Sequence, residues 1–131
     1  MVKSVSAFSG FSVNDQAQAK DFYSNTLGLE LVNEKMGLRY ALPGGGTVFI
    51  YQKNDHQPAS FTVLNLVVAD IDEAVQSITD KGVQFEMYDN LFEGAHQEES
   101  GILRSPDVEK YGPPIAWFKD PAGNILSVIQ A

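Results

Sequence analysis

Histidine and carboxylate residues come together at two places in the sequence. His56 follows Asp55, and His96 lies near the glutamates at positions 93, 98 and 99. An imidazole beside a carboxylate can move a proton or help to hold a divalent metal ion. Both stretches are polar and prone to turns, so solvated loops are the favoured interpretation of both.

Serine residues offer a second kind of chemistry, that of a nucleophile. Ser9, Ser12 and Ser127 lie in segments that also contain apolar residues. A serine hydroxyl is a weak nucleophile until a neighbouring base takes its proton. The sequence positions no histidine to activate any of the three, so we do not expect a hydrolase.

The elements that would position these residues follow one order in the first half of the chain. We expect a strand over residues 5–13, and then a helix that begins at Asn14 or Asp15 and stops at Gly28. Three short strands follow, at residues 29–33, 38–42 and 47–52. Glycines between these strands suit the tight turns that would join them.

The same order recurs in the second half. A strand over residues 61–68 precedes a helix, for which Asp70 and Glu73 have capping-box spacing, and Gly82 ends that helix. Further strands are predicted at residues 83–88, 115–118 and 125–130. The connection from 89 to 114 is long for so small a domain, which indicates either a functional lid or a hidden strand, with residues 101–104 as the candidate strand.

The repeated order βαβββ indicates a duplicated module. We therefore expect one domain over residues 1–131, made of two modules at roughly 4–53 and 60–131 with a linker at roughly 54–59.

Composition limits the function classes. The formal net charge is −8, so a nucleic-acid surface is not expected, and the acidity weakly favours a cationic ligand. The chain has no cysteine, which excludes disulfides and thiolate metal sites. No apolar run reaches the length of a membrane span or of a signal-peptide core, so we expect no membrane partner and a cytoplasmic location.

Three segments together resemble the vicinal oxygen chelate superfamily, which includes glyoxalase I, bleomycin-resistance proteins and extradiol dioxygenases. The resemblance covers nearly the whole chain and rests on residues 13–29, 68–72 and 120–124. It implies an α+β fold, the glyoxalase/bleomycin-resistance fold, in which two βαβββ modules form a curled mixed sheet around a cup. It also implies a homodimer as the common assembly.

The resemblance further implies where a metal ion would be held in the superfamily's enzymes. Carried over by motif, the four ligand positions fall near Phe8 or Ser9, near Val63 or Leu64, within residues 49–51, and at Ser127. None of these residues is a histidine, aspartate or glutamate, the side chains that a divalent ion would need there. We therefore expect no metal and no other cofactor.

A cup without metal ligands would bind through its aromatic side chains, because flat organic molecules stack on such rings. Catalytic residues cannot be assigned from the sequence. The ligand-binding residues that we predict are Phe8, Phe11, Tyr51, Phe61, Glu86, Tyr88, Phe92, Trp117 and Ser127.

The favoured function is that of a metal-free binding protein, which sequesters a small aromatic or cationic organic molecule and works as a homodimer. One alternative is a lyase or dioxygenase of the same superfamily with a displaced metal site or a metal-free acid and base pair. Glu86 is its first candidate residue. A second alternative is a structural dimer whose cup is filled by side chains.

Overall fold

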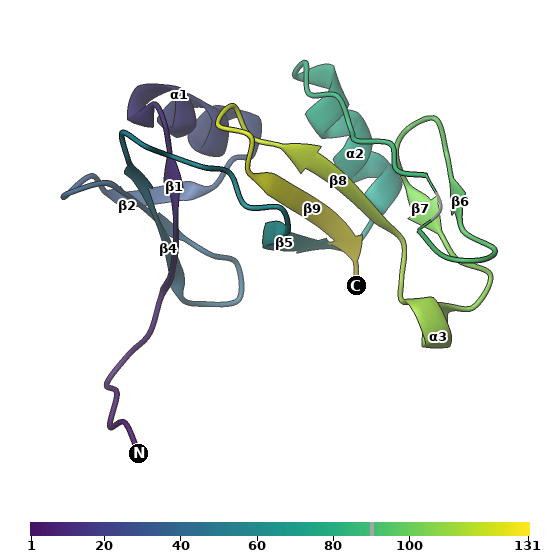
Figure 1. The fold of residues 1–131 in the computed structure, drawn as a ribbon, viewed down its shortest axis with the longest axis horizontal. Helices are drawn as coiled ribbons and strands as arrows, with labels where there is room; N and C mark the ends of the chain where they lie inside the picture. The colour runs from purple at the N-terminus through teal and green to yellow at the C-terminus, as the bar shows by residue number, and fades with distance from the viewer. Residues whose placement is uncertain (90) are drawn as a thin grey trace. The chain divides into compact units, whose positions relative to one another are not determined.

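A computed structural model describes residues 1–89 and 91–131, which form two compact units, Met1–Pro58 and Ala59–Ala131 (Figure 1). Each unit combines helices with one mixed sheet, of four strands in the first unit and five in the second. The predicted α+β class is therefore confirmed. Asn90, in the predicted long connection, lies outside the described residues.

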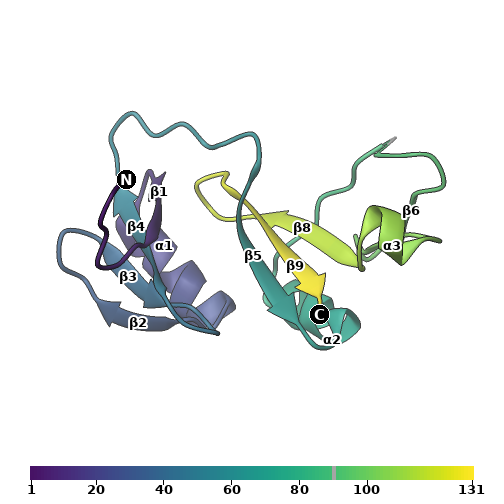
Figure 2. The same cartoon turned by 90° about the horizontal axis from the view of Figure 1, so that it is seen from below.

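The sheet of the first unit has the order β1-β4-β3-β2. Strand β1 runs parallel to β4, and the other neighbours are antiparallel (Figure 2). The predicted strand over 5–13 is wrong at its start, because the pairing with β4 begins only at Ser9. The elements are β1 (Ser9–Val13), α1 (Gln16–Asp21), a π-helical turn η1 (Phe22–Thr26), β2 (Glu30–Asn33), β3 (Leu38–Ala41) and β4 (Thr47–Gln52).

The helix of the first unit begins and ends where its sequence signals predict. The Asp15 side chain accepts a hydrogen bond from the Gln18 amide at 3.0 Å, which satisfies one of the unpaired amides of the first turn. Helix α1 continues directly into η1, and Gly28 ends it with φ of 72°.

Tyr40 on β3 and Tyr23 on η1 are fully buried and join the sheet to the helix. Their rings lie 5.9 Å apart. The Tyr40 hydroxyl contacts the Ser24 hydroxyl at 2.8 Å and donates to the Lys20 carbonyl oxygen at 3.3 Å. Burial raises the pKa of the Tyr40 phenol above its ordinary value of 10.0.

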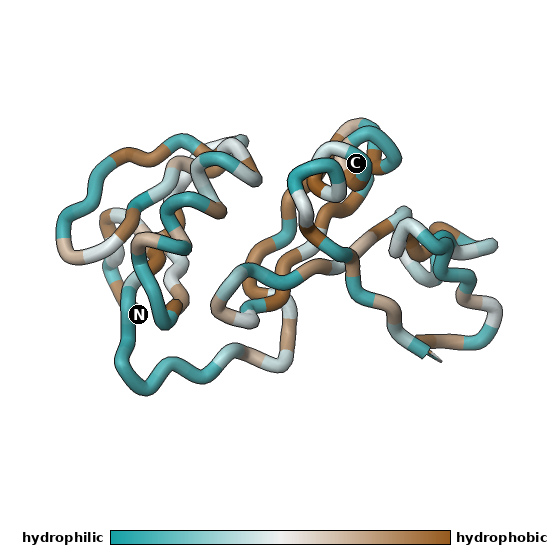
Figure 3. The backbone as a smooth tube through the Cα atoms, turned by 90° about the horizontal axis from the view of Figure 1, so that it is seen from above, coloured by the Kyte–Doolittle hydropathy of each residue, from teal (hydrophilic) through white to brown (hydrophobic). Residues whose placement is uncertain are grey.

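The sheet of the second unit has the order β5-β9-β8-β7-β6, in which only β5 and β9 are parallel. Ile71, Val75 and Ile78 form the buried stripe of α2. Apolar and polar stretches alternate along the chain of both units (Figure 3). The elements are β5 (Thr62–Val68), α2 (Ile71–Asp80), β6 (His96–Gln97), β7 (Leu103–Arg104), α3 (Val108–Tyr111), β8 (Ile115–Lys119) and β9 (Ile125–Gln130).

The predicted strand over 83–88 is wrong, since this segment is not part of the sheet. The backbone ties it to β8 by the hydrogen bond from the Glu86 amide to the Trp117 carbonyl oxygen, at 2.8 Å. The Gln97 side chain makes the next contacts, accepting from the Tyr88 amide at 2.8 Å and donating to the Glu86 carbonyl oxygen at 2.7 Å. The Gln97 side chain thus makes the hydrogen bonds that the backbone of a neighbouring strand would make in a sheet.

The long connection hides more structure than the sequence indicates. Of the candidate strand 101–104, only Leu103–Arg104 forms a strand, β7. The sequence does not predict the short elements β6 and α3. No helix among the described residues is long and apolar enough to cross a membrane.

The closing hairpin of β8 and β9 is confirmed, and Asp120 organises its turn. Its side chain is only 4% exposed and accepts hydrogen bonds from the amides of Ala122 and Asn124 and from the Asn124 side chain, at 2.8 to 3.0 Å. Gly123 takes φ of 87°, which a residue with a side chain rarely adopts.

Candidate functional site

Three aromatic rings gather on the face of the four-stranded sheet that points away from its helix. We call Phe8, Phe49 and Tyr51 the aromatic face. Phe49 and Tyr51 alternate along β4 with the buried residues Val48 and Ile50, so their side chains point to the opposite side. The Phe49 and Tyr51 rings stack at 5.8 Å and 19°, and Phe8 meets Phe49 edge-on at 6.3 Å.

The aromatic face is open and closely supported. Phe8 is 58% exposed, although large apolar side chains are usually buried in a sheet. Beneath the Phe49 ring lies Gly37, where an added Cβ would stand 2.7 Å from the ring. The glycine therefore lets the ring lie against the backbone.

Arg39 on β3 carries the positive charge of this face. Its guanidinium carbon lies 4.5 Å from the centre of the Phe8 ring and 5.3 Å from that of Phe49. One of its terminal nitrogens donates to the Thr47 hydroxyl at 3.0 Å. Cation–π attraction and this hydrogen bond hold the guanidinium in one place on the sheet.

A serine and a histidine meet on the same side of β1. The Ser12 hydroxyl lies 2.7 Å from Nδ1 of His56, so the expectation that no histidine can reach these serines is wrong for Ser12. The expectation that His56 is a solvated linker residue also fails, because its side chain is half-buried. The segment after β4 therefore brings the His56 imidazole next to β1.

Phe11 does not join the aromatic face, although it was predicted with Phe8. Its ring lies 6.0 Å from that of the buried Tyr23, on the side that η1 covers. Phe8, the residue before β1, meets the Phe49 ring instead, on the other side of the sheet. The structure therefore brings together Phe8 and Tyr51 of the predicted residues in the first unit, and separates Phe11 from them.

Ser127 lies on β9, between the strands β5 and β8 of the five-stranded sheet. It is 0% exposed, and its hydroxyl donates to the side-chain oxygen of Asn65, its register partner on β5. The predicted ligand-binding hydroxyl is thus enclosed within its own unit and has a hydrogen-bond partner there.

Trp117 and Tyr88 form a second aromatic pair, with ring centres 5.4 Å apart in an edge-to-face arrangement. Burial and the nearby Glu86 carboxylate raise the pKa of the Tyr88 phenol. Glu86 itself pairs with Lys119 at 3.2 Å on the adjacent strand. Its carboxylate is therefore already neutralised by an ion pair.

A cavity of about 290 Å³ lies beside this pair within the second unit. Phe92 and Tyr88 line it, and Phe92 stacks face to face on Tyr111 of α3 at 4.1 Å. Phe61, which precedes β5, is 68% exposed and is not among the lining residues. The lining residues are Tyr88, Leu91, Phe92, Glu93, Gly94, Ala95, Gln97 and Leu103.

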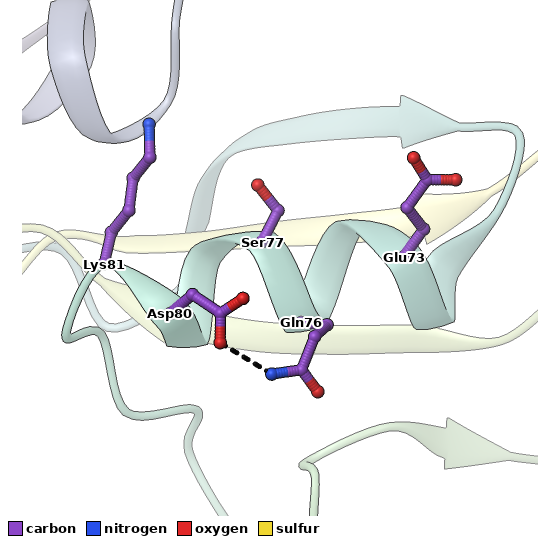
Figure 4. A pocket seen from close by; sticks show the side chains of 5 residues that line it. All are labelled: Glu73, Gln76, Ser77, Asp80 and Lys81. Carbon is purple, nitrogen blue, oxygen red and sulfur yellow. Dashed lines mark hydrogen bonds between the residues drawn. The ribbon is translucent and has the colours of Figure 1, made fainter.

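A groove of about 460 Å³ runs along α2 and is lined by polar side chains (Figure 4). The Gln76 side chain donates to the Asp80 carboxylate at 2.7 Å, as residues four apart on a helix surface commonly do. These side chains point outward from the helix, which is the ordinary arrangement of a solvated helix face.

The donor set at the implied metal positions does not fit a divalent ion. Phe49 and Tyr51 present rings, and Ser127 and Asn65 present neutral oxygens that bond to each other. In the part of the chain that the structure describes, no three His, Asp or Glu side chains lie close enough to share a metal ion. Zinc and the other divalent metals of such enzymes require imidazole or carboxylate ligands, which these positions lack.

Sequence reasoning overlooked Phe49, Arg39 and Ser12 as members of one surface. Phe49 could have been found from the alternation of β4, since it lies two residues from the predicted Tyr51. The pairing of Ser12 with His56 depends on the path of the linker, for which the sequence carries no signal.

Comparisons with known proteins agree with the fold of this chain. The family described as the Glyoxalase/Bleomycin resistance protein/Dioxygenase superfamily matches residues 8–128. A comparison with curated proteins gave no match.

Solved structures share the fold over nearly the whole chain. TnmS3, an antibiotic binding protein from Streptomyces sp. CB03234, is 25% identical with a TM-score of 0.67, and the match covers 98% of each chain. A glyoxalase/bleomycin resistance protein from the same organism is 25% identical with a TM-score of 0.63, covering 95% of this chain and 100% of that one.

A more distant structure shares the fold alone. FosX, a fosfomycin resistance protein from Listeria monocytogenes, is 14% identical with a TM-score of 0.67, covering 100% of this chain and 95% of that one. The family match spans most of the sequence, and the resemblance seen in the motifs is confirmed. The chain belongs to the glyoxalase/bleomycin resistance protein/dioxygenase superfamily.

Proposed function

We propose that this protein binds a small planar aromatic molecule, without a metal ion, on the aromatic face of its first unit. The observation that carries the proposal is the gathering of Phe8, Phe49 and Tyr51 on one side of the sheet, opposite its own helix. Offset and edge-to-face contacts with such rings stabilise a flat ligand beyond the area it buries.

The comparisons support binding rather than a particular ligand. TnmS3, which is 25% identical to this chain, is described as an antibiotic binding protein. Many antibiotics contain planar aromatic groups, so a ligand of that class suits the rings of this face. The absence of a fitting donor set at the implied metal positions makes the proposed binding metal-independent.

The test is calorimetry of wild-type protein and two matched variants with a panel of planar aromatic compounds, after dialysis against EDTA. Phe49→Leu removes a ring from the aromatic face, and we expect it to weaken binding by about threefold to tenfold. Phe11→Leu removes a ring from the other side of the same sheet, so it should lower the melting temperature but leave the Kd within about twofold.

Two results would overturn the proposal. One is the failure of every aromatic compound to bind while Zn²⁺, Ni²⁺ or Fe²⁺ raises the melting temperature. The other is equal loss of affinity in both variants, which would mean that the rings act only through stability.

The contact of Ser12 with His56 favours a second candidate function, a metal-free acid–base enzyme that uses this pair on the same face. Mass spectrometry of the bound compound after long incubation separates the two functions. A binding protein returns the compound unchanged. An enzyme converts it, and the conversion should disappear in His56→Gln.

We also propose that the protein is a homodimer. Strand β5 lies at the edge of the five-stranded sheet, and the apolar side chains of Val67 on this strand and of Phe61 just before it are each 68% exposed. Exposed apolar side chains on an edge strand favour association with another chain. Light scattering should give twice the mass of one chain for the wild type and the mass of one chain for Val67→Lys. A monomeric wild type would contradict the assembly.

A further inference from the structure

We infer that the ligand of the aromatic face carries a carboxylate, which pairs with Arg39. This inference rests on the proposed function, because it specifies the class of molecule that the same face takes, namely a planar aromatic carboxylate. It follows from the position and the unmatched charge of Arg39.

Arg39 is held where a bound ligand would meet it. The rings of Phe8 and Phe49 lie 4.5 and 5.3 Å from its guanidinium carbon, and the Thr47 hydroxyl accepts one of its hydrogen bonds at 3.0 Å. A guanidinium has five N–H donors in a planar fork that matches a carboxylate. The contact with Thr47 uses one of these donors and leaves others for a ligand.

The charge of Arg39 has no carboxylate partner among residues 1–89 and 91–131. The second arginine of the chain differs in this respect, because Arg104 pairs with both Asp72 and Glu98. Arg39 is moreover half-buried, in a chain with 17 acidic and 9 basic residues. A half-buried cation held by rings and a neutral hydroxyl is a receptor for an anion.

The polar groups of the face lie toward opposite ends of the row formed by Phe49 and Tyr51. Arg39 is the register partner of Phe49, and Ser12, which contacts His56, is the register partner of Tyr51. Two residues along a strand span about 6.7 Å, close to the length of a fused two-ring system. A two-ring carboxylate could stack on the row with its anion toward Arg39.

The net charge of −8 acts in the opposite direction and would favour a cation. At physiological salt, charges more than about 8 Å away are largely screened. A direct hydrogen-bonded pair with Arg39 is short-range and partly shielded from solvent. We therefore expect the local charge of the face to decide the preference.

The experiment is calorimetry at 150 mM NaCl with three probes of similar shape: 2-naphthoate, neutral 2-naphthamide and cationic 2-naphthylmethylamine. Wild-type protein should bind the carboxylate about tenfold more tightly than the amide. Arg39→Gln should remove that preference, so that the variant binds the carboxylate and the amide with equal affinity. Arg104→Gln deletes the same charge in the second unit and should keep the tenfold preference.

The outcomes separate the inference from the proposed function. If the amide binds and the carboxylate does not bind more tightly, or the amine binds best, the inference is overturned and the aromatic site stands. If none of the three probes binds, both are overturned. If light scattering shows a dimer that Arg39→Gln dissociates, the face is an interface between two copies, which also overturns the inference. Thermal unfolding of Arg39→Gln, measured in parallel, establishes that the variant is folded.

Discussion

Ser127 is enclosed on β9, where the resemblance to metal enzymes implies a carboxylate. Its hydroxyl donates to Asn65, and the side chain is 0% exposed. A residue of this size and polarity suits the space between two parallel strands. A carboxylate there would lose its hydration, and the neighbouring residues offer no imidazole or second carboxylate to share a metal ion.

We expect Ser127→Glu to lower the free energy of unfolding by about 3 kcal/mol, because the variant buries an unpaired charge. Zinc should not restore the loss. Urea denaturation with and without Zn²⁺ measures both effects, with Ser9→Glu as the exposed control, expected within about 0.5 kcal/mol of wild type. Recovery of the stability of Ser127→Glu in zinc would contradict the conclusion that this site does not fit a metal.

The buried Tyr40 hydroxyl contacts the Ser24 hydroxyl and the Lys20 carbonyl oxygen. Tyr40→Phe should therefore cost about 1 kcal/mol of stability. Tyr51→Phe, on the aromatic face, is the matched control and should change stability by less than about 0.5 kcal/mol. Equal effects in the two variants would mean that the Tyr40 contacts do not stabilise the unit.

The same phenol predicts a loss of stability in alkali. Its pKa is raised in the folded state above the ordinary value of 10.0, so the unfolded chain loses its proton first. The stabilising difference is fully present below pH 10 and is lost as the pH rises from there through the folded pKa. Urea denaturation from pH 8 to pH 11 should show a steeper fall for wild type than for Tyr40→Phe, and parallel curves would contradict this.

At the scale of elements, the closing hairpin depends on one side chain. Asp120 accepts hydrogen bonds from two backbone amides and from the Asn124 side chain. Asp120→Ala should lower the free energy of unfolding by about 3 kcal/mol, since it leaves buried donors unpaired. Asp120→Asn keeps an accepting oxygen and should lose less. A loss below about 1 kcal/mol for the alanine variant, measured by urea denaturation, would contradict this role.

The sequence predicts most elements of both units because their signals are local. Asp15 and Asp70 cap the two helices as expected, and their acceptor contacts reach Gln18 and Glu73. The failures depend on contacts that are distant in sequence. Residues 83–88 alternate like a strand, but Gln97 satisfies their backbone groups instead of a neighbouring strand.

The candidate site was predicted only in part. The resemblance indicates Phe8 and Tyr51, but only the structure shows that Phe49 and Tyr51 point to the face that Phe8 meets. Phe11 is the register partner of the buried Ile50, which places it on the helix side of the sheet. The Ser12–His56 contact joins residues 44 positions apart, and no local pattern predicts it.

At the scale of the whole molecule, the two units repeat one plan: a mixed sheet whose first strand runs parallel to its last, with a helix on one side. The side of each sheet that faces away from the helix differs between the two units. In the first unit that side carries the exposed Phe8 ring, the half-buried rings of Phe49 and Tyr51, and Arg39, which has no carboxylate partner among the described residues. In the second unit it carries the buried Ser127, whose hydroxyl donates to Asn65. The expected single-domain organisation stays a prediction.

The central claim is that a planar aromatic ligand lies on the aromatic face without a metal ion. The most direct measurement is a titration of EDTA-treated, ¹⁵N-labelled protein with 2-naphthamide, followed by amide chemical shifts. We expect the largest shifts in β1 and β4, around Gly10, Ser12 and Tyr51, and no shifts in α2. Shifts confined to residues 88–103 around the second unit's cavity, or no shifts until Zn²⁺ is added, would contradict it.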